Sequence, residues 1–194
     1  MTVTDELRSR VREDLPEVED ISDSDLRDKV VEAWATSLAG SSFGSISEIR
    51  PSGNPDTPPL KSGTQTDHIR GVTRLAVRIA DELMEMFPDL KVDRDTLIAG
   101  GLCHDVGKPW EFDPERQVRW KEDPRAKGWP SIRHPGYGVH ICLTVGLPEE
   151  VAHIAGGHSA EGEFVVRSLE NTIVHQADVD FWRILEAGGL VEEK

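Results

Sequence analysis

Apolar residues along this chain recur with the spacing of helices that bury one face. Over residues 66–86 they follow the i, i+3, i+4 rhythm, and over residues 24–38 they recur every four residues. Further helices are predicted at 93–104, 136–145, 149–156 and 164–185. No segment alternates between polar and apolar residues for long enough to predict a strand. The pattern therefore predicts an all-α fold.

Three segments break this helical pattern. Residues 40–65 are rich in Gly, Ser and Pro, and form either a plain linker or a loop that covers a site. Residues 109–133 are interrupted by tryptophan and proline, which predicts an inserted irregular loop anchored by its tryptophans. Residues 1–20 are charged and interrupted by Pro16, which leaves a short helix and partial disorder as alternatives.

The helix predicted at residues 24–38 carries a single apolar stripe. Its members are Leu26, Val30, Trp34 and Leu38. Such a stripe is expected to pack against the main domain. A homodimer formed through this stripe is the weaker alternative.

Charge and composition narrow the range of partners and compartments. The net charge is −14, and an acidic surface repels phosphate backbones, which argues against binding of duplex nucleic acid. No apolar run approaches the roughly 20 residues of a membrane span, and the acidic N-terminus does not resemble a secretory signal. Cys103 and Cys142 stand alone among apolar residues, which favours buried free thiols and a cytoplasmic location.

The most informative motif is His104-Asp105-Val106-Gly107-Lys108. An imidazole and a carboxylate next to each other can both bind a divalent metal. They follow the apolar run 97–103, which predicts a buried helix end where packing would fix both ligands. Gly107 and Pro109 should end this helix, so Lys108 is expected at the mouth of a pocket.

Other histidines and one aspartate lie where a pocket could gather them. His68, His134 and His158 stand next to turns at helix ends, and Asp178 lies in a stretch of small residues in the last predicted helix. The remaining histidines are expected to be structural or to support the ligands: His140, His153 and His175.

The order of these residues, His, His-Asp, two further His and then Asp, resembles the HD-domain superfamily of metal-dependent phosphohydrolases. The resemblance covers about residues 66–185 and is carried by the motif at 104–108, by His68-Ile69-Arg70-Gly71-Val72 and by His134-Pro135-Gly136-Tyr137-Gly138. It implies an HD-like helical bundle with metal-binding residues at 66–190. A helical extension at 1–45 and a Pro/Gly/Ser-rich loop at 46–65 would precede this bundle.

The resemblance also implies a metal site. His68, His104, Asp105 and Asp178 would bind one metal, and Asp105 would bridge to a second metal held by His134 and His158. Imidazole and carboxylate ligands suit Fe, Mn, Zn, Co or Ni, and the sequence does not select among them. One or two divalent transition metals are therefore expected.

The function that the resemblance implies is a metal-dependent phosphohydrolase acting on a small phosphorylated substrate, a nucleotide or another phosphoester. A metal-bound hydroxide would be the nucleophile. Asp105 and Lys108 are the predicted catalytic residues, with Lys108 contacting a phosphate or developing negative charge. Arg70 and Arg133, each near a proposed ligand, are further candidates for contact with the substrate anion.

Two alternatives are kept beside this prediction. Di-iron oxygenases of the same superfamily, which cleave C–C or C–P bonds with O₂, share the ligand order and the following Gly-Lys, and Gln65 would then help to cover the iron. A non-catalytic sensor on an HD scaffold is less favoured, because the ligand set is intact. Residues 159–163 lack the second His and the Gly-Tyr-Pro run of cyclic-dinucleotide phosphodiesterases, which argues against that subfamily.

Overall fold

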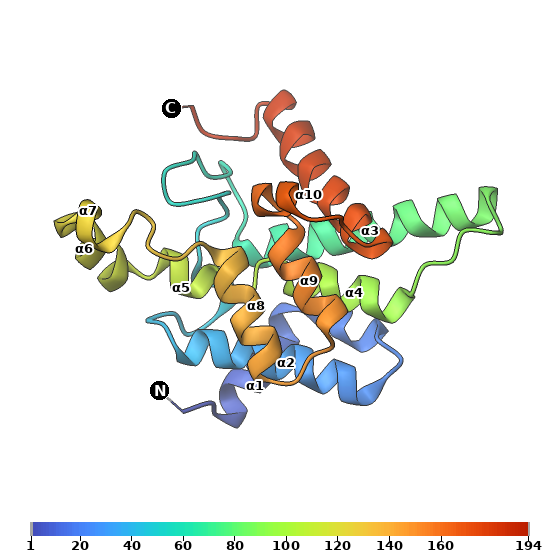
Figure 1. Cartoon of the computed structure of the whole chain (residues 1–194), viewed down its shortest axis with the longest axis horizontal. Coiled ribbons are helices and arrows are strands. Elements are labelled where there is room, and N and C mark those ends of the chain that lie inside the picture. The colour runs from blue at the N-terminus through green and yellow to red at the C-terminus, as the bar shows by residue number, and fades with distance from the viewer. Residues whose placement is uncertain (1, 194) are drawn as a thin grey trace.

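The computed structural model describes residues 2–193, and the fold over this range is helical, with one isolated β-bridge between Leu60 and Val191. Figure 1 shows α3 and α10 lying together above a lower layer that contains α1 and α2. The longer helices are α1 (Asp5–Asp14), α2 (Ser24–Ala39), α3 (Gln65–Met86), α4 (Arg94–Cys103), α8 (His134–Thr144), α9 (Glu149–Gly157) and α10 (Leu169–Ala187). The all-α prediction is confirmed.

Segment 109–133 differs from its prediction, because it is not an irregular loop. It lies within three short helices and their connections, α5 (Lys108–Phe112), α6 (Pro114–Glu122) and α7 (Pro124–Lys127). Asp113 and Asp123 cap α6 and α7 by accepting hydrogen bonds from backbone N–H groups of the first turn. The N–H groups of a first turn have no partner within the helix, so a proline there costs no helical hydrogen bond. These prolines therefore begin helices and do not break them.

The last helix also begins later than the prediction of residue 164. Residues Ala160–Phe164 form the short 3₁₀ helix η3, and α10 starts at Leu169. The Ser168 side chain caps α10 by accepting from the backbone N–H of Asn171. A serine cap of this kind fixes the start of a helix more firmly than apolar periodicity does.

Helix α4 lies in the core, and every residue from Leu97 to Cys103 is buried. Helices α2, α3 and α9 pack against it. A methyl group on Gly100 would clash with Ile154 of α9, and one on Gly101 would lie 3.0 Å from the Thr73 Oγ1 of α3. The two glycines therefore let α9 and α3 approach α4 closely, which fixes the segment that follows α4.

The N-terminal helices share this core. All four residues of the apolar stripe are buried, Trp34 Nε1 donates to the Leu102 carbonyl at 2.8 Å, and Ser37 Oγ donates to the Val106 carbonyl at 2.6 Å. The stripe packs on α4 as expected. Because the stripe is buried within one chain, it offers no surface to a second copy, and a homodimer stays a prediction without an assigned interface.

Residues 46–65 include the 3₁₀ turn η2 (Ile46–Glu48) and otherwise run without helix to α3. The segment is tied to the C-terminal end of the chain, since the Lys61 N–H donates to the Leu190 carbonyl at 2.8 Å. Cys103 and Cys142 are buried free thiols, as expected. None of the helices within residues 2–193 is long and apolar enough to cross a membrane.

Candidate metal centre

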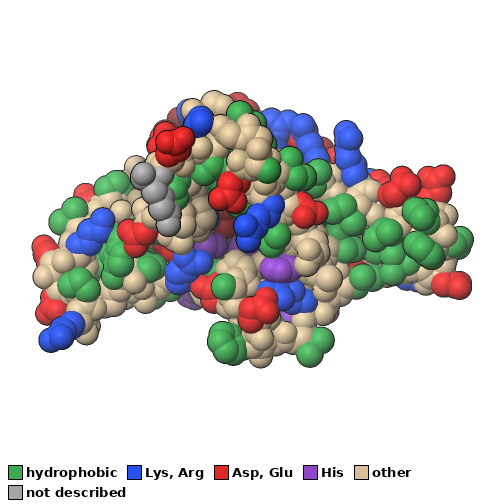
Figure 2. All heavy atoms as spheres, turned by 90° about the horizontal axis from the view of Figure 1, so that it is seen from above, with side chains coloured by type: hydrophobic (Ala, Val, Ile, Leu, Met, Phe, Trp, Pro, Cys, Tyr) green, Lys and Arg blue, Asp and Glu red, His purple; other side chains and the backbone are tan. Residues whose placement is uncertain are grey.

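Six side chains that lie far apart in the sequence meet in one buried cluster. They come from α3, the turn after α4, the start of α8, the end of α9 and the middle of α10: His68, His104, Asp105, His134, His158 and Asp178. Five of these residues are buried, and the Asp178 side chain is 16% exposed. Figure 2 shows histidine side chains in a recess near the middle of the face seen from above.

Asp105 lies at the centre of the cluster, and its two oxygens face different histidines. Oδ2 lies 3.2 Å from His68 Nε2 and 3.5 Å from His104 Nε2. Oδ1 lies 3.2 Å from His134 Nε2 and 3.6 Å from His158 Nε2. A carboxylate shared in this way can bridge two metal ions.

Two positions for a metal can be defined from these contacts. The first position is the space bounded by His68, His104, Asp178 and Asp105 Oδ2. The second position is bounded by His134, His158 and Asp105 Oδ1. Within each position the His and Asp105 ligand atoms lie within 4.8 Å of one another. Asp178 joins the first position, because its Oδ1 is 3.4 Å from His68 Nε2.

The Nδ1 hydrogen bonds of His104 and His158 direct their Nε2 atoms into the cluster. His104 Nδ1 lies 2.6 Å from the Gly101 carbonyl, and His158 Nδ1 lies 3.0 Å from the Ala155 carbonyl. A carbonyl only accepts, so each Nδ1 carries the proton and each Nε2 has a lone pair.

The donor set also fits a metal electrostatically. His104 Nε2 and His68 Nε2 are 3.2 Å apart, and Asp178 Oδ1 is buried without a hydrogen-bond partner. Electron-rich atoms this close to one another repel unless a proton or a metal cation lies between them, and a metal cation could take this place. The residues present therefore fit one or two divalent metals, without selecting which metal.

The pKa shifts of His104, Asp105 and His134 favour the protonation states that a metal needs, whereas contact with Asp105 outweighs burial and raises the pKa of His158. Burial lowers the pKa of His104 to about 4, so its imidazole is neutral near pH 7. Burial alone would raise the pKa of Asp105, but the charges of Lys108 and the neighbouring histidines outweigh it and hold the pKa well below the usual value. Burial also lowers the pKa of His134, against opposing effects of Asp105 and Glu111.

Lys108 is not at the mouth of a pocket, as the sequence suggested, but is buried beside the cluster. Its Nζ lies 3.5 Å from Asp105 Oδ2 and donates to the carbonyls of Ser52 and Gly53. The difference arises because Lys108 begins α5, beneath the loop at 46–65. Of the two interpretations of that loop, covering a site is the one that the structure supports.

Arg70 is not brought into the cluster. It lies two residues after His68 on α3, so it points about 200° around the helix from that histidine. Its Nε is 3.0 Å from both carboxylate oxygens of Glu17. This pair holds the N-terminal segment against α3, and the contact of Arg70 with substrate stays a prediction that the structure does not support.

Arg133 lies near the cluster but is already paired with acidic residues. It contacts Glu111 Oε1 at 3.3 Å through Nη1 and Glu161 Oε1 at 3.0 Å through Nε. The guanidinium is therefore already paired, and the structure gives no support to its predicted contact with substrate.

Two residues beside the cluster had no firm role in the sequence-based prediction. Glu111 contacts His134, and Gln65 Nε2 donates to Asp105 Oδ2 at 2.6 Å. Gln65 was considered only as a cover in the oxygenase alternative, and Glu111 was hidden in the segment predicted to be irregular. Its position three residues after Lys108 would have placed it on the same helix face, had that segment been predicted as helical.

The other histidines have structural contacts. His153 Nε2 accepts from the backbone N–H of Ser168 at 3.2 Å, and His175 Nδ1 lies 2.5 Å from the His158 carbonyl. His140 packs near Tyr137, with ring centroids 5.6 Å apart. These contacts agree with the expected structural or supporting roles.

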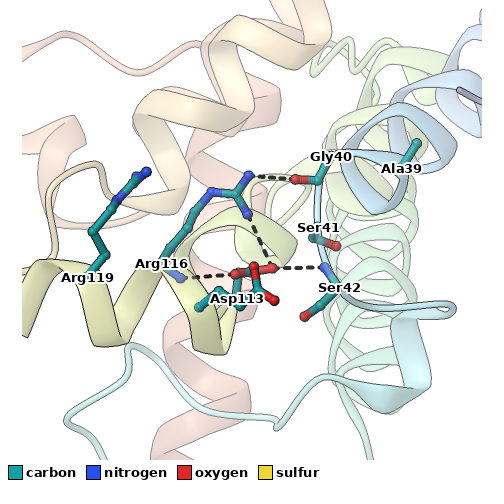
Figure 3. Close-up of a pocket in the computed structure, with 8 residues that line it drawn as sticks. Ala39, Gly40, Ser41, Ser42, Asp113, Arg116 and Arg119 are labelled. Atoms are coloured by element: carbon teal, nitrogen blue, oxygen red, sulfur yellow. Dashed lines mark hydrogen bonds and ion pairs between the residues drawn. The ribbon is translucent and has the colours of Figure 1, made fainter. Parts of the chain in front are cut away.

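A separate hollow of about 420 Å³ lies between the end of α2 and α6 (Figure 3). Arg116 Nη2 donates to the Gly40 carbonyl at 2.7 Å, and the Ser42 N–H donates to Asp113 at 2.8 Å. These contacts pair the polar groups with one another and join the two elements. None of the six cluster residues lines this hollow.

Comparisons with known proteins agree with the cluster. A family model described as HD domain matches residues 66–180, a range that contains all six cluster residues. The chain is 32% identical over 119 residues to a dihydroneopterin 2',3'-cyclic phosphate phosphodiesterase from Methanocaldococcus jannaschii. This match covers 60% of the chain and 45% of the relative, so the chain spans less than half the length of that protein. No solved structure matches.

Proposed function

This chain belongs to the HD domain family, and on that premise we propose that it is a metal-dependent phosphohydrolase. The observation that carries the proposal is the placement of Asp105, whose two oxygens each face two histidines. Such a site suits two divalent transition metals that share one carboxylate. Bound divalent metals would supply Lewis acidity for a phosphoryl oxygen and would make a nearby water more acidic.

The proposed substrate is a small phosphoester. The relative from Methanocaldococcus jannaschii is named for a cyclic phosphodiester, so a 2',3'-cyclic phosphate is the first substrate class to test. In the hydrolysis, an oxygen from water bonds to phosphorus, a P–O bond to the alcohol breaks, and the alcohol oxygen takes up a proton. The proposed class is defined by the cyclic phosphate and includes both pterin and nucleoside derivatives.

Lys108 is the residue of this chain that is best placed to bind the substrate phosphate. Its ammonium group is buried next to Asp105 and is held by two backbone carbonyls. A neutral carbonyl is a weaker partner for an ammonium than a phosphate oxygen is. Movement of the loop at 46–65 would let Lys108 exchange these carbonyls for the phosphate.

Gln65 holds the central carboxylate in place through its hydrogen bond to Asp105 Oδ2. The covering loop and Gln65 also lie where the oxygenase alternative requires them. That alternative predicts a di-iron centre that consumes O₂ with a small polar substrate. Hydrolysis is preferred because the relative that matches this chain is named as a phosphodiesterase.

The test is anaerobic purification without chelating resin, elemental analysis, and assays of the same sample in two formats. Hydrolysis is measured on 2',3'-cyclic phosphates, nucleoside monophosphates and simple phosphodiesters, and O₂ uptake is measured with phosphonates and polyols. The proposal expects metal-dependent release of phosphomonoester or phosphate with no O₂ uptake. Substrate-dependent O₂ consumption without hydrolysis would replace it by the oxygenase alternative. Less than half an equivalent of metal under all loading conditions would favour a non-catalytic scaffold.

A further inference from the structure

We propose that Glu111 is a positioning residue that makes the second position able to hold a metal. This inference rests on the proposed function, because it assumes that the cluster binds metal. Glu111 touches neither position itself and acts through His134. It lies on α5, a five-residue helix that also carries Lys108.

The Glu111 carboxylate is fully buried and contacts His134 twice. Its Oε2 accepts from the His134 backbone N–H at 2.9 Å and also bonds to the ring Nδ1 of the same residue. Two contacts from one oxygen fix both the start of α8 and the rotation of the imidazole. The helix needs this support, because its N-cap residue, Arg133, makes no capping hydrogen bond through its side chain.

Within residues 2–193, no other histidine of the cluster has a carboxylate in contact with its Nδ1. His104 and His158 are backed by neutral backbone carbonyls, and His68 Nδ1 is buried without a hydrogen-bond partner. A carboxylate behind a metal-binding imidazole fixes the tautomer and makes the other ring nitrogen a stronger electron donor. Glu111 therefore makes Nε2 of His134 a stronger electron donor than Nε2 of the other three cluster histidines.

The second position needs this support more than the first position does. The first position has Asp178 in addition to its share of Asp105, whereas Asp105 Oδ1 is the one charged group that the described residues bring to the second position. A divalent cation at the second position therefore meets less negative charge directly. The charge on Glu111, transmitted through His134, compensates for the missing carboxylate.

Arg133 and Glu161 complete the surroundings of Glu111. Arg133 Nη1 lies 3.3 Å from Glu111 Oε1, and Glu161 holds the same guanidinium through Nε at 3.0 Å. Glu161 therefore resembles Glu111 in charge and in its contact with Arg133, but it has no recorded contact with His134. This makes Glu161→Gln a matched control for Glu111→Gln.

The experiment is a calorimetric titration of metal-free wild type, Glu111→Gln and Glu161→Gln with Mn²⁺, which reports binding without requiring activity. Glutamine keeps an oxygen that can accept from the His134 N–H groups but removes the charge. We expect two equivalents in the wild type. In Glu111→Gln, the Kd of one equivalent should rise about 10–100-fold while the other changes by less than about 3-fold. Glu161→Gln should resemble the wild type, and thermal melts of all three proteins check folding.

Unchanged binding of both equivalents in Glu111→Gln would overturn the inference, as would equal weakening of both. If Glu161→Gln weakens one equivalent as much as Glu111→Gln does, the inference is also overturned. The effect would then arise from the pairing with Arg133 and not from His134. A wild type that binds a single equivalent would refute the inference and leave a one-metal phosphohydrolase standing. A wild type that binds none would instead refute the proposed function.

Discussion

The two halves of the cluster around Asp105 are supported by different parts of the fold. The first position takes His68 and Asp178 from α3 and α10, which pack against each other and against α4. The second position takes His134 and His158 from the start of α8 and the end of α9, two helices that also pack together. The first position therefore takes its histidine and its own carboxylate from long core helices, whereas His134 of the second position also depends on Glu111 of the short helix α5.

The two positions also differ in charge. Asp178 gives the first position a carboxylate of its own, with an Oδ1 that lacks a hydrogen-bond partner. The additional carboxylate of the second position is that of Glu111, which contacts His134 and does not face the position itself. The two positions therefore differ in how negative charge would reach a bound cation. In the first position Asp178 would supply it directly, and in the second position Glu111 would supply it through His134.

Substitution of Asp105 by alanine should have the largest effect, because it removes the group common to both positions. We expect loss of both metal equivalents and a fall in kcat/KM of about 10³-fold or more. Elemental analysis and the hydrolysis assay check this. His153→Ala serves as the control and should keep metal and activity, since the His153 side chain accepts from the backbone N–H of Ser168, outside the cluster. Full turnover in Asp105→Ala would refute the site.

Substitution of Lys108 by methionine should separate phosphate binding from metal binding. The methionine is similar in length and lacks the ammonium, so both metal equivalents should stay bound. We expect kcat/KM to fall about 10²–10³-fold through lost stabilisation of phosphate charge. Steady-state kinetics on metal-loaded protein measures this. A loss of metal in parallel with activity would assign Lys108 to the support of Asp105 instead.

Substitution of Asp178 by asparagine should weaken the first position selectively. The change keeps the size of the side chain and removes the direct charge, so one equivalent should bind about 10–100-fold more weakly. Titration with Mn²⁺ measures the effect, and combination with Glu111→Gln tests the comparison further. If the two positions are supported separately, the double variant should show both weakened steps. If the same equivalent weakens in each single variant, the proposed division between the positions is wrong.

Substitution of Gly100 by alanine should have the smallest effect on chemistry and act on stability. The added methyl group would clash with Ile154, so the free energy of unfolding should fall by about 1–3 kcal/mol. Thermal unfolding should show a decrease in Tm of about 2–4 °C per kcal/mol for a chain of this size. Gly136→Ala is the control, because its new methyl group would meet only Ile132 at 4.0 Å. Equal Tm values for the two variants would contradict the close packing of α4 and α9.

Local sequence patterns predicted much of the fold and the six residues of the cluster. Helical periodicity identified α2, α3 and α4 closely, and histidines next to turns, read with the family resemblance, identified the residues that converge. The cluster residues could be predicted because histidine and aspartate are typical metal-binding residue types, and the family resemblance supplied their order.

The features that could not be predicted depend on long-range contacts. The burial of Lys108 depends on Ser52, which lies 56 residues earlier in the chain. The role of Arg70 depends on Glu17, a partner 53 residues away that periodicity does not reveal. Glu111 was missed because prolines in first turns were interpreted as breaks. The division into residues 1–45, 46–65 and 66–190 stays a prediction, while the N-terminal helices share the core of the rest.

The most direct test of the central claim is anomalous diffraction from crystals grown with Mn²⁺ as the added metal. If Asp105 bridges two cations, the difference map will contain two peaks about 3.5–4 Å apart. One peak will lie against His68, His104 and Asp178, and the other against His134 and His158. A single peak, or peaks that do not contact Asp105, would contradict the account.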